Sequence, residues 1–311
     1  MGAANFGKLT DTLAQGAARA AIPGRDATCE PAPGSLWRGG ANVLCFIGFA
    51  VLAIFGTLVL LPAALVLPGN RSRRVRRLAS LGFRILLVFI QSFSLGKIHI
   101  EGKENLARAS GCLLIANHPS FVDSLVLFAL LPEANCIMKA VLRHHPLFAP
   151  FVHAGGYISN ASGPLETIAA CRRAKENGET IIIFPEGSRT PADTMPRLHR
   201  GAAQIALRAG MDILPVTIHC DPPILTHDRP WYYMPSRRVE YVVSFHEPRQ
   251  PRAFAPTDDL SPPHAARRLT RALQTWFEHQ FDSMHTADIA PPSAPQSTFE
   301  ATASLQPNRS S

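Results

Sequence analysis

A histidine and an aspartate five residues apart offer acid–base chemistry. Residues 117–123 read Asn-His-Pro-Ser-Phe-Val-Asp and directly follow an apolar run typical of a strand. On a continuous helix His118 and Asp123 would lie about 140° apart, so they meet only if His118 precedes a helix and folds back over its first turn. Asp123 would then fix the imidazole tautomer and leave one ring nitrogen as a general base. A helix-capping histidine and an N-terminal aspartate explain the spacing equally well.

A second polar loop follows another apolar strand. Residues 184–190 read Phe-Pro-Glu-Gly-Ser-Arg-Thr, in which Gly187 permits a tight turn with positive φ. Such a turn would direct Arg189 and backbone N–H groups toward an anion beyond the strand ends. In isolation the stretch is equally consistent with an ordinary connection and an exposed arginine. Because both loops occupy carboxyl ends of strands, the pair favours one shared site.

These loops require an α/β scaffold. Short β-rich runs alternate with helical segments from Lys97 onward, which predicts one domain with a mixed, largely parallel sheet flanked by helices. Expected strands are 98–100, 112–116, 136–138, 180–184, 213–219 and 239–245, and expected helices are 120–131, 164–177, 201–209 and 265–281.

An apolar segment precedes this domain. Val43–Leu67 carries no charge, and as a helix it would extend roughly 37 Å, enough to span a bilayer core of about 30 Å. Five arginines follow between Arg71 and Arg77, which predicts contact with anionic lipid and a cytoplasmic location for that end.

A second apolar segment, 78–95, carries Ser80, Arg84 and Gln91 within about 40° of one another on a helix. This polar stripe favours an interfacial helix. A hairpin of two spans remains an alternative from the sequence alone.

Composition limits the class of protein. The chain has 311 residues, 46% of them hydrophobic, and a formal net charge of +8, which excludes a disordered or disulfide-stapled chain. Its six cysteines show no metal-binding spacing, so reduced thiols and no metal are expected. The predicted organisation is a loose tail at 1–42, with 21–40 rich in Gly, Pro and Ala, membrane-anchoring helices at 43–95, a catalytic domain at 96–282 and a disordered tail at 283–311.

The two loops, together with the Ile-Leu-Pro-Val strand at 213–216, resemble motifs one, three and four of the PlsC-like glycerolipid acyltransferases. The resemblance covers roughly residues 97–245 in the family's order. It implies that His118 takes the proton from an acceptor hydroxyl, which attacks an acyl thioester directly, and that Asp123 orients His118. No Gly-x-Ser-x-Gly nucleophile elbow is present to form an acyl-enzyme.

The same resemblance implies a substrate-binding set: Asn117, Lys139, Glu186, Gly187, Ser188, Arg189 and Thr190. It also implies acyl-CoA or acyl carrier protein as co-substrate, with no further cofactor. The implied partners are membrane lipids and not nucleic acid, and the implied location is the cytoplasmic face of a bacterial inner membrane. The default acceptor is 1-acyl-glycerol-3-phosphate, in phospholipid biosynthesis.

One residue departs from the family pattern. Ser162 stands about where motif two has an arginine that pairs with the acceptor phosphate, and a hydroxyl cannot replace a guanidinium at equal strength. Arg143 and Arg200 are candidates to compensate. An aminolipid, a glycolipid or another lipid alcohol therefore stays open as acceptor. A non-catalytic lipid-binding protein and a thioester hydrolase are the alternatives from other functional classes.

Overall fold

The computed structural model describes residues 34–93, 95–145, 148–189, 197–226, 235, 237–256 and 259–287. Its helices, including short 3-10 (η2, η3, η4) and π (η1) segments, are α2 Gly34–Phe55, η1 Gly56–Leu60, α3 Leu61–Val66, α4 Arg71–Ser92, η2 Lys103–Arg108, α5 Val122–Leu130, η3 Ala140–Arg143, α6 Ala149–Ala154, η4 Asn160–Ser162, α7 Pro164–Glu176, α8 Gly201–Ala209, α9 Pro251–Phe254 and α10 Pro262–Ala287. Its strands are β1 Gly96–Glu101, β2 Leu113–Ala116, β3 Asn135–Met138, β4 Ile158–Ser159, β5 Ile181–Ile183, β6 Ile213–Asp221 and β7 Val239–Phe245.

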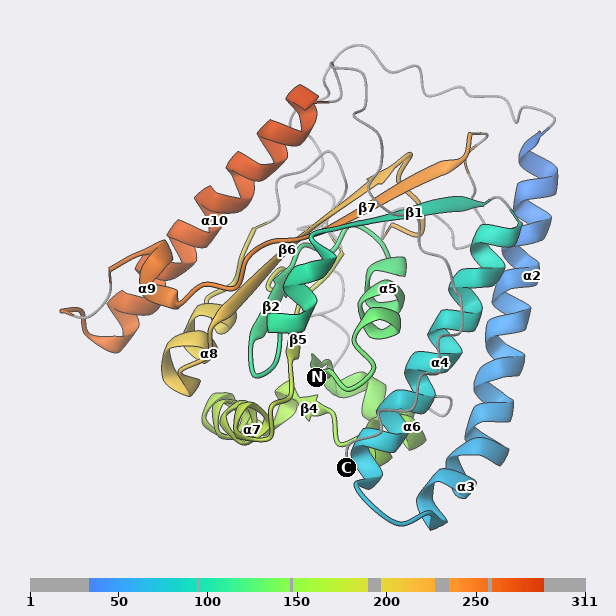
Figure 1. Ribbon diagram of the computed structural model, residues 1–311, viewed down its shortest axis with the longest axis horizontal. Coiled ribbons are helices and arrows are strands. Elements are labelled where there is room, and N and C mark those ends of the chain that lie inside the picture. Colours follow the sequence, from blue (N-terminus) through green and yellow to red (C-terminus); the bar gives the residue numbers. More distant parts are fainter. Residues whose placement is uncertain are drawn as a thin grey trace, which may run out of the picture.

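The strands form one sheet in the order β1-β7-β6-β2-β5-β3-β4. Only the β6–β7 pairing is antiparallel, so the expected mixed, largely parallel sheet is confirmed. Helices cover both faces, with α4 and α5 on one side and α7, α8 and α10 on the other (Figure 1). Alternate residues of the central strands therefore enter two separate cores, which is why these strands are continuously apolar.

Three differences from the sequence prediction concern the two ends of the described chain and the edge of the sheet. Helix α2 begins at Gly34, so the predicted loose stretch 21–40 and tail 1–42 are already helical from that residue. Helix α10 continues to Ala287, five residues into the predicted disordered tail. Strand β4 was not predicted, because a two-residue strand leaves no periodic signal.

Helix α2 does not stand clear of the domain. The segment Trp37–Val66 is the one described helix long and apolar enough to cross a membrane. It nevertheless packs lengthwise beside α4 (Figure 1). At its amino end Arg38 donates a hydrogen bond to the Arg237 carbonyl, and at the other end Leu61 packs with Val75 of α4 and Ala154 of α6. The predicted span thus packs beside α4 and contacts the α/β domain at its two ends.

Two residues of the polar stripe of α4, Ser80 and Arg84, hydrogen-bond to the domain. Ser80 is buried, and its hydroxyl and the Arg84 Nε both donate to the Ala129 carbonyl, at 3.4 and 2.8 Å. Ala129 lies in the last turn of α5, where carbonyls lack helical partners. Some apolar side chains of α4 are exposed, namely Leu81, Ile85, Val88 and Phe89, whereas Val75, Leu86 and Leu87 are buried.

The arginine run forms the first turns of α4 and is largely paired within the protein. Arg74 donates to the carbonyls of Ala64, Leu67 and Pro68 at the end of α3. Arg73 and Arg77 pair with Glu133, and Arg76 pairs with Glu179, while Arg71 and Arg77 are exposed. Part of the run therefore holds α4 onto the domain, and contact of its exposed arginines with anionic lipid stays a prediction.

Candidate active site

Strand pairing brings the two polar loops together. Strands β2 and β5 are adjacent and parallel, with Ile115 opposite Ile183, so the residues that follow them leave the sheet at the same edge. His118 follows β2, and Phe184 follows β5. Their rings stack with centroids 4.1 Å apart and planes inclined by 21°.

His118 and Asp123 meet as the fold-back geometry requires. Helix α5 begins at Val122, so Asp123 lies in its first turn and His118 lies before it. The His118 Nδ1 and Asp123 Oδ2 are 2.7 Å apart. The Ser120 backbone N–H donates to the same Oδ2 at 2.9 Å. Because Nδ1 is engaged, Nε2 is the ring nitrogen left for a substrate.

Asp123 is fully buried, and this sets its protonation. Burial raises the pKa of the carboxyl from 3.8 to about 6, against the hydrogen bonds from His118 and Ser120 and the charge of Arg189, which lower it. Within the described part of the chain, Oδ1 of Asp123 has no hydrogen-bond partner. At neutral pH the carboxylate is ionised and holds the Nδ1–H tautomer of His118.

Two predicted substrate-binding residues make hydrogen bonds within the scaffold. The Asn117 amide donates to the Ile218 carbonyl and accepts from the Ile218 N–H, both at 2.7 Å, which ties the end of β2 to β6. The buried Glu186 accepts the His118 backbone N–H at 2.9 Å. Neither side chain lines the cavity described below, and both hold the backbone around His118 in place. Their predicted part in substrate binding stays a prediction.

The other predicted residues do line one large cavity. Lys139, Gly187, Ser188 and Arg189 border it together with His118. Gly187 has φ of +69°, as its turn requires. Arg189 donates to the Leu225 carbonyl at 2.6 Å, so part of its fork is already used. Thr190 lies outside the described residues.

The cavity has a volume of about 880 Å³ and continues away from His118 into apolar surroundings. It passes Phe128 of α5 and reaches Leu52 and Gly56 on the α2–η1 segment. It is also bordered by Leu81 and Ile85, which are exposed on the outer face of α4. The cavity therefore connects the His118 ring with the apolar surface of the helices.

The arginines expected to compensate for Ser162 do not reach this space. Ser162 is exposed at the end of η4 and does not border the cavity. Arg143 contacts the ring of His153 at 3.5 Å, and Arg200 is exposed before α8; neither lines the cavity. Among the described residues, Lys139 and Arg189 are the lysine and arginine side chains that do.

Sequence reasoning missed the ring of Phe184. The residue was read as the end of a strand, and only the adjacency of β2 and β5 brings it onto His118. A sheet order cannot be read from the sequence of separate strands. An aromatic residue directly before the Pro-Glu-Gly turn was the one available signal.

The comparisons with known proteins point in one direction. Residues 97–219 match the family model described as Acyltransferase. A crystal structure of the 1-acyl-sn-glycerophosphate (LPA) acyltransferase, PlsC, from Thermotoga maritima has the same fold, with a TM-score of 0.62 and 19% identity over 83% of this chain and 100% of that one.

Curated relatives include three informative matches. A 1-acyl-sn-glycerol-3-phosphate acyltransferase of Chlamydomonas reinhardtii is 27% identical over 65% of this chain and 62% of its own length. Another from Borreliella burgdorferi is 28% identical over 40% of this chain and 51% of its own length. A lyso-ornithine lipid O-acyltransferase of Pseudomonas aeruginosa is 34% identical over 34% of this chain and 42% of its own length. The chain thus spans less than two thirds of the length of these relatives.

Proposed function

We propose that the protein is a membrane-associated O-acyltransferase that moves a fatty acyl group from a thioester to the hydroxyl of a lysolipid. The observation that carries this proposal is the cavity that runs from His118 to the apolar faces of α2 and α4. Its volume of about 880 Å³ lies in the upper range of ligand pockets, and its lining suits a hydrocarbon chain.

The site chemistry needs one base and no covalent intermediate. His118 Nε2 takes the proton from the acceptor hydroxyl, whose oxygen attacks the thioester carbonyl carbon. A carbon–oxygen bond forms, the carbon–sulfur bond breaks, and the imidazolium returns its proton to the leaving thiolate. Asp123 stabilises the imidazolium, and Lys139 is positioned at the cavity to meet an anionic group of either substrate. Acyl-CoA or acyl carrier protein is the co-substrate, and no cofactor is required.

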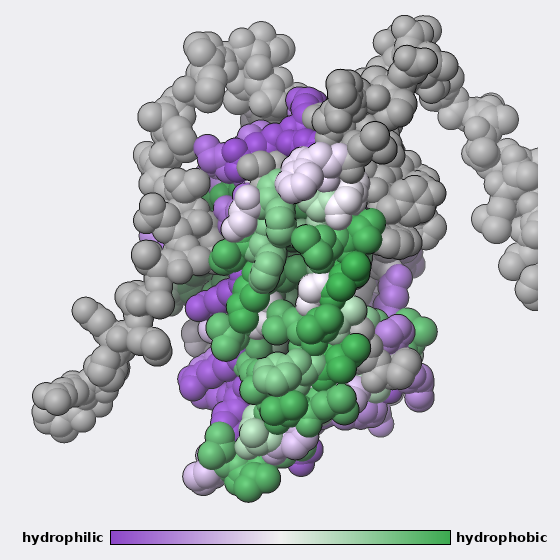
Figure 2. Space-filling model, turned by 90° about the vertical axis from the view of Figure 1, so that its right-hand side faces the viewer, coloured by the Kyte–Doolittle hydropathy of each residue, from purple (hydrophilic) through white to green (hydrophobic). Residues whose placement is uncertain are grey.

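Membrane association is supported by the outer surface of the helices. Figure 2 shows hydrophobic side chains gathered over the face that includes α2. Exposed residues on it include Leu44, Ile47, Val51, Ile54, Leu58, Val66, Leu81, Ile85 and Phe89. Because α2 is docked on the domain, we propose that this face lies in one leaflet and that α2 does not cross the bilayer alone.

We place the catalytic domain on the cytoplasmic face of a bacterial inner membrane. The five cysteines that the structure describes are free thiols, all buried, which suits a reducing compartment. The arginine cluster beside the apolar segment supports the same orientation.

The default acceptor is 1-acyl-glycerol-3-phosphate, for which most of the matched relatives are named. A lyso-aminolipid is the second candidate. It is favoured by Ser162, which puts no guanidinium at the motif-two position, and by the match to the lyso-ornithine lipid O-acyltransferase.

The test uses purified full-length protein in lipid vesicles. Labelled acyl-CoA and acyl carrier protein are each offered with a panel of lysophospholipids and lyso-ornithine lipid, and products are identified by mass. We expect an acylated lipid from at least one pair. Thioester consumption without an acyl-lipid product would indicate a hydrolase, and lysolipid binding without thioester consumption would indicate a binding protein.

A further inference from the structure

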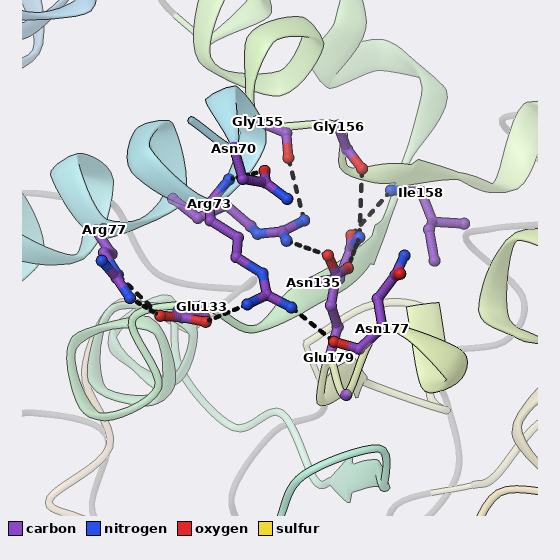
Figure 3. A network of polar contacts seen from close by, with 12 residues as sticks. Asn70, Arg73, Arg77, Glu133, Asn135, Gly155, Gly156, Ile158, Asn177 and Glu179 are labelled. Carbon is purple, nitrogen blue, oxygen red and sulfur yellow. Dashed lines mark hydrogen bonds and ion pairs between the residues drawn. The ribbon is translucent and has the colours of Figure 1, made fainter. Parts of the chain in front are cut away.

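Arg76, Asn135 and Glu179 form a polar network at the amino ends of β3 and β5, whereas His118 follows the carboxyl end of β2. Figure 3 shows Asn135 and Glu179 beside the turn at Gly155 and Gly156. Arg76 is 2% exposed and Asn135 4% exposed, and they come from α4 and the start of β3. Arg76 pairs with Glu179, which precedes β5, and Asn135 Nδ2 donates to the other oxygen of that carboxylate at 3.0 Å. A buried charge pair of this kind adds little net stability and suggests a positional role.

The remaining groups of the network converge on one turn. Arg76 Nη1 donates to the Gly155 carbonyl at 3.2 Å, and Asn135 Nδ2 is 3.3 Å from the Gly156 carbonyl. The Ile158 N–H donates to Asn135 Oδ1 at 3.2 Å. The backbone of 155–158 is therefore held from α4 and from β3 at once.

The turn at residues 155–158 is closely packed, both within itself and against α4. A Cβ on Gly155 would lie 2.7 Å from the Tyr157 ring. Gly156 has φ of +63°, and a Cβ there would lie 3.0 Å from the Ser72 hydroxyl on α4. The two glycines thus allow direct packing of the turn against the first turn of α4.

This turn carries a wall of the cavity. Tyr157 borders the cavity and is buried, with its ring edge-on to Phe128 at 5.7 Å. Helix α4 contributes Ala79 to the same cavity, one helical turn after Arg76. The distance between these two walls depends on how firmly α4 and the turn are joined. The network supplies the hydrogen bonds between them, in addition to the packing of Gly156 on Ser72.

We propose that Arg76, Asn135 and Glu179 are positioning residues that set the acyl-chain length the cavity accepts. The network fixes Tyr157, which borders the cavity beside Phe128, relative to α4, and so fixes the width that a hydrocarbon chain has in that part of the cavity. The inference rests on the proposed acyltransferase function and adds a residue-level basis for its donor selectivity.

The test replaces the ion pair with apolar residues of similar length. Arg76→Met/Glu179→Met removes the bonds to Gly155 and to Asn135 without leaving a lone buried charge, which keeps the fold accessible. Arg77→Met/Glu133→Met is the matched control, because it removes a more exposed ion pair whose arginine also lies on α4. Both are assayed with saturated acyl-CoA or acyl carrier protein donors of 8 to 18 carbons, whichever donor class the wild type uses.

In the wild type, one misfitting methylene changes kcat/KM by about tenfold or more if the pocket is rigid. For the Arg76→Met/Glu179→Met variant we expect the discrimination between the best chain and longer chains to fall by about fivefold or more. The kcat/KM for the shortest chains, which do not reach Tyr157, stays within about twofold, and amide exchange at Ile158 becomes faster.

An unchanged chain-length profile in a folded Arg76→Met/Glu179→Met variant would overturn the proposal. An equal loss at every chain length would also overturn it, since that is the signature of a purely structural role. Asn135→Ala, which removes the amide contacts to Glu179 and to the Gly156 carbonyl without adding a charge, serves as the second variant if the double variant does not fold. Failure of the proposed function itself is distinct, because the wild type would then transfer no acyl group.

Discussion

At the scale of single residues, Asp123 links catalysis to pH. Its folded pKa of about 6 lies above the ordinary 3.8, so the folded state binds more protons between these values. The free energy of unfolding therefore falls as pH rises from about 4 to 6, and the cost persists at pH 7. The protein therefore has a lower unfolding free energy at neutral pH than it would have with a neutral side chain at position 123.

Asp123→Asn removes this titration. Relative to the wild type, the variant should gain about 2–3 kcal/mol in unfolding free energy between pH 4 and pH 7, measured by denaturant unfolding at each pH. Acyl transfer should fall by about 10²–10⁴-fold, because the amide no longer holds the Nδ1–H tautomer of His118. A pH-independent stability difference between the two proteins would contradict the assigned pKa.

Ser162 tests the choice of acceptor. Ser162→Arg introduces a guanidinium at the motif-two position, so kcat/KM for 1-acyl-glycerol-3-phosphate should rise by about tenfold, the worth of one charge-assisted hydrogen bond. Ala161→Arg, at the exposed neighbouring position, is the control and should leave kcat/KM unchanged. Equal effects of the two substitutions would show only a general gain of positive charge.

At the scale of elements, the ends of β2, β5 and β6 hold the site together. Asn117→Ala would leave both backbone groups of Ile218 unpaired and should lower the unfolding free energy by about 2–4 kcal/mol. Below the new melting temperature the KM for the acceptor should stay unchanged, because Asn117 does not face the cavity. A raised KM with unchanged stability would restore the substrate-binding role predicted from the motif.

The elements also show how far the sequence could predict the site. The strands before both loops follow from local patterns, and the structure contains them. The spacing of His118 and Asp123 fitted helix capping equally well, and the structure shows that the two side chains meet. The hydrogen bonds of Asn117 and Glu186 do not follow from the sequence, because their partners belong to β6 and to the backbone of another loop. The same holds for Ser80 and Arg84 of α4, whose shared acceptor, Ala129, lies 45 residues or more away.

At the scale of the whole molecule, the apolar face of α2 and α4 should bind lipid. Leu58 is 70% exposed on that face, whereas Leu165 is 67% exposed on α7, on the other side of the sheet. Leu58→Glu should weaken partitioning into phospholipid vesicles by about tenfold or more, given the free energy of burying one leucine. Leu165→Glu should leave partitioning unchanged in the same sedimentation assay. Equal losses would place the bilayer elsewhere on the molecule.

The central claim is that His118 is the base of an acyl transfer. Acyl-lipid formation is measured for His118→Ala and for His99→Ala, in vesicles, with the donor and acceptor that the wild type prefers. His99 is the matched control, since its Nε2 also faces a carboxylate, Glu240 at 3.0 Å, but it lies on β1 away from the cavity. We predict that His118→Ala loses transfer by about 10²-fold or more while its vesicle binding is retained, and that His99→Ala keeps wild-type activity. Full transfer by a folded His118→Ala variant would contradict the account.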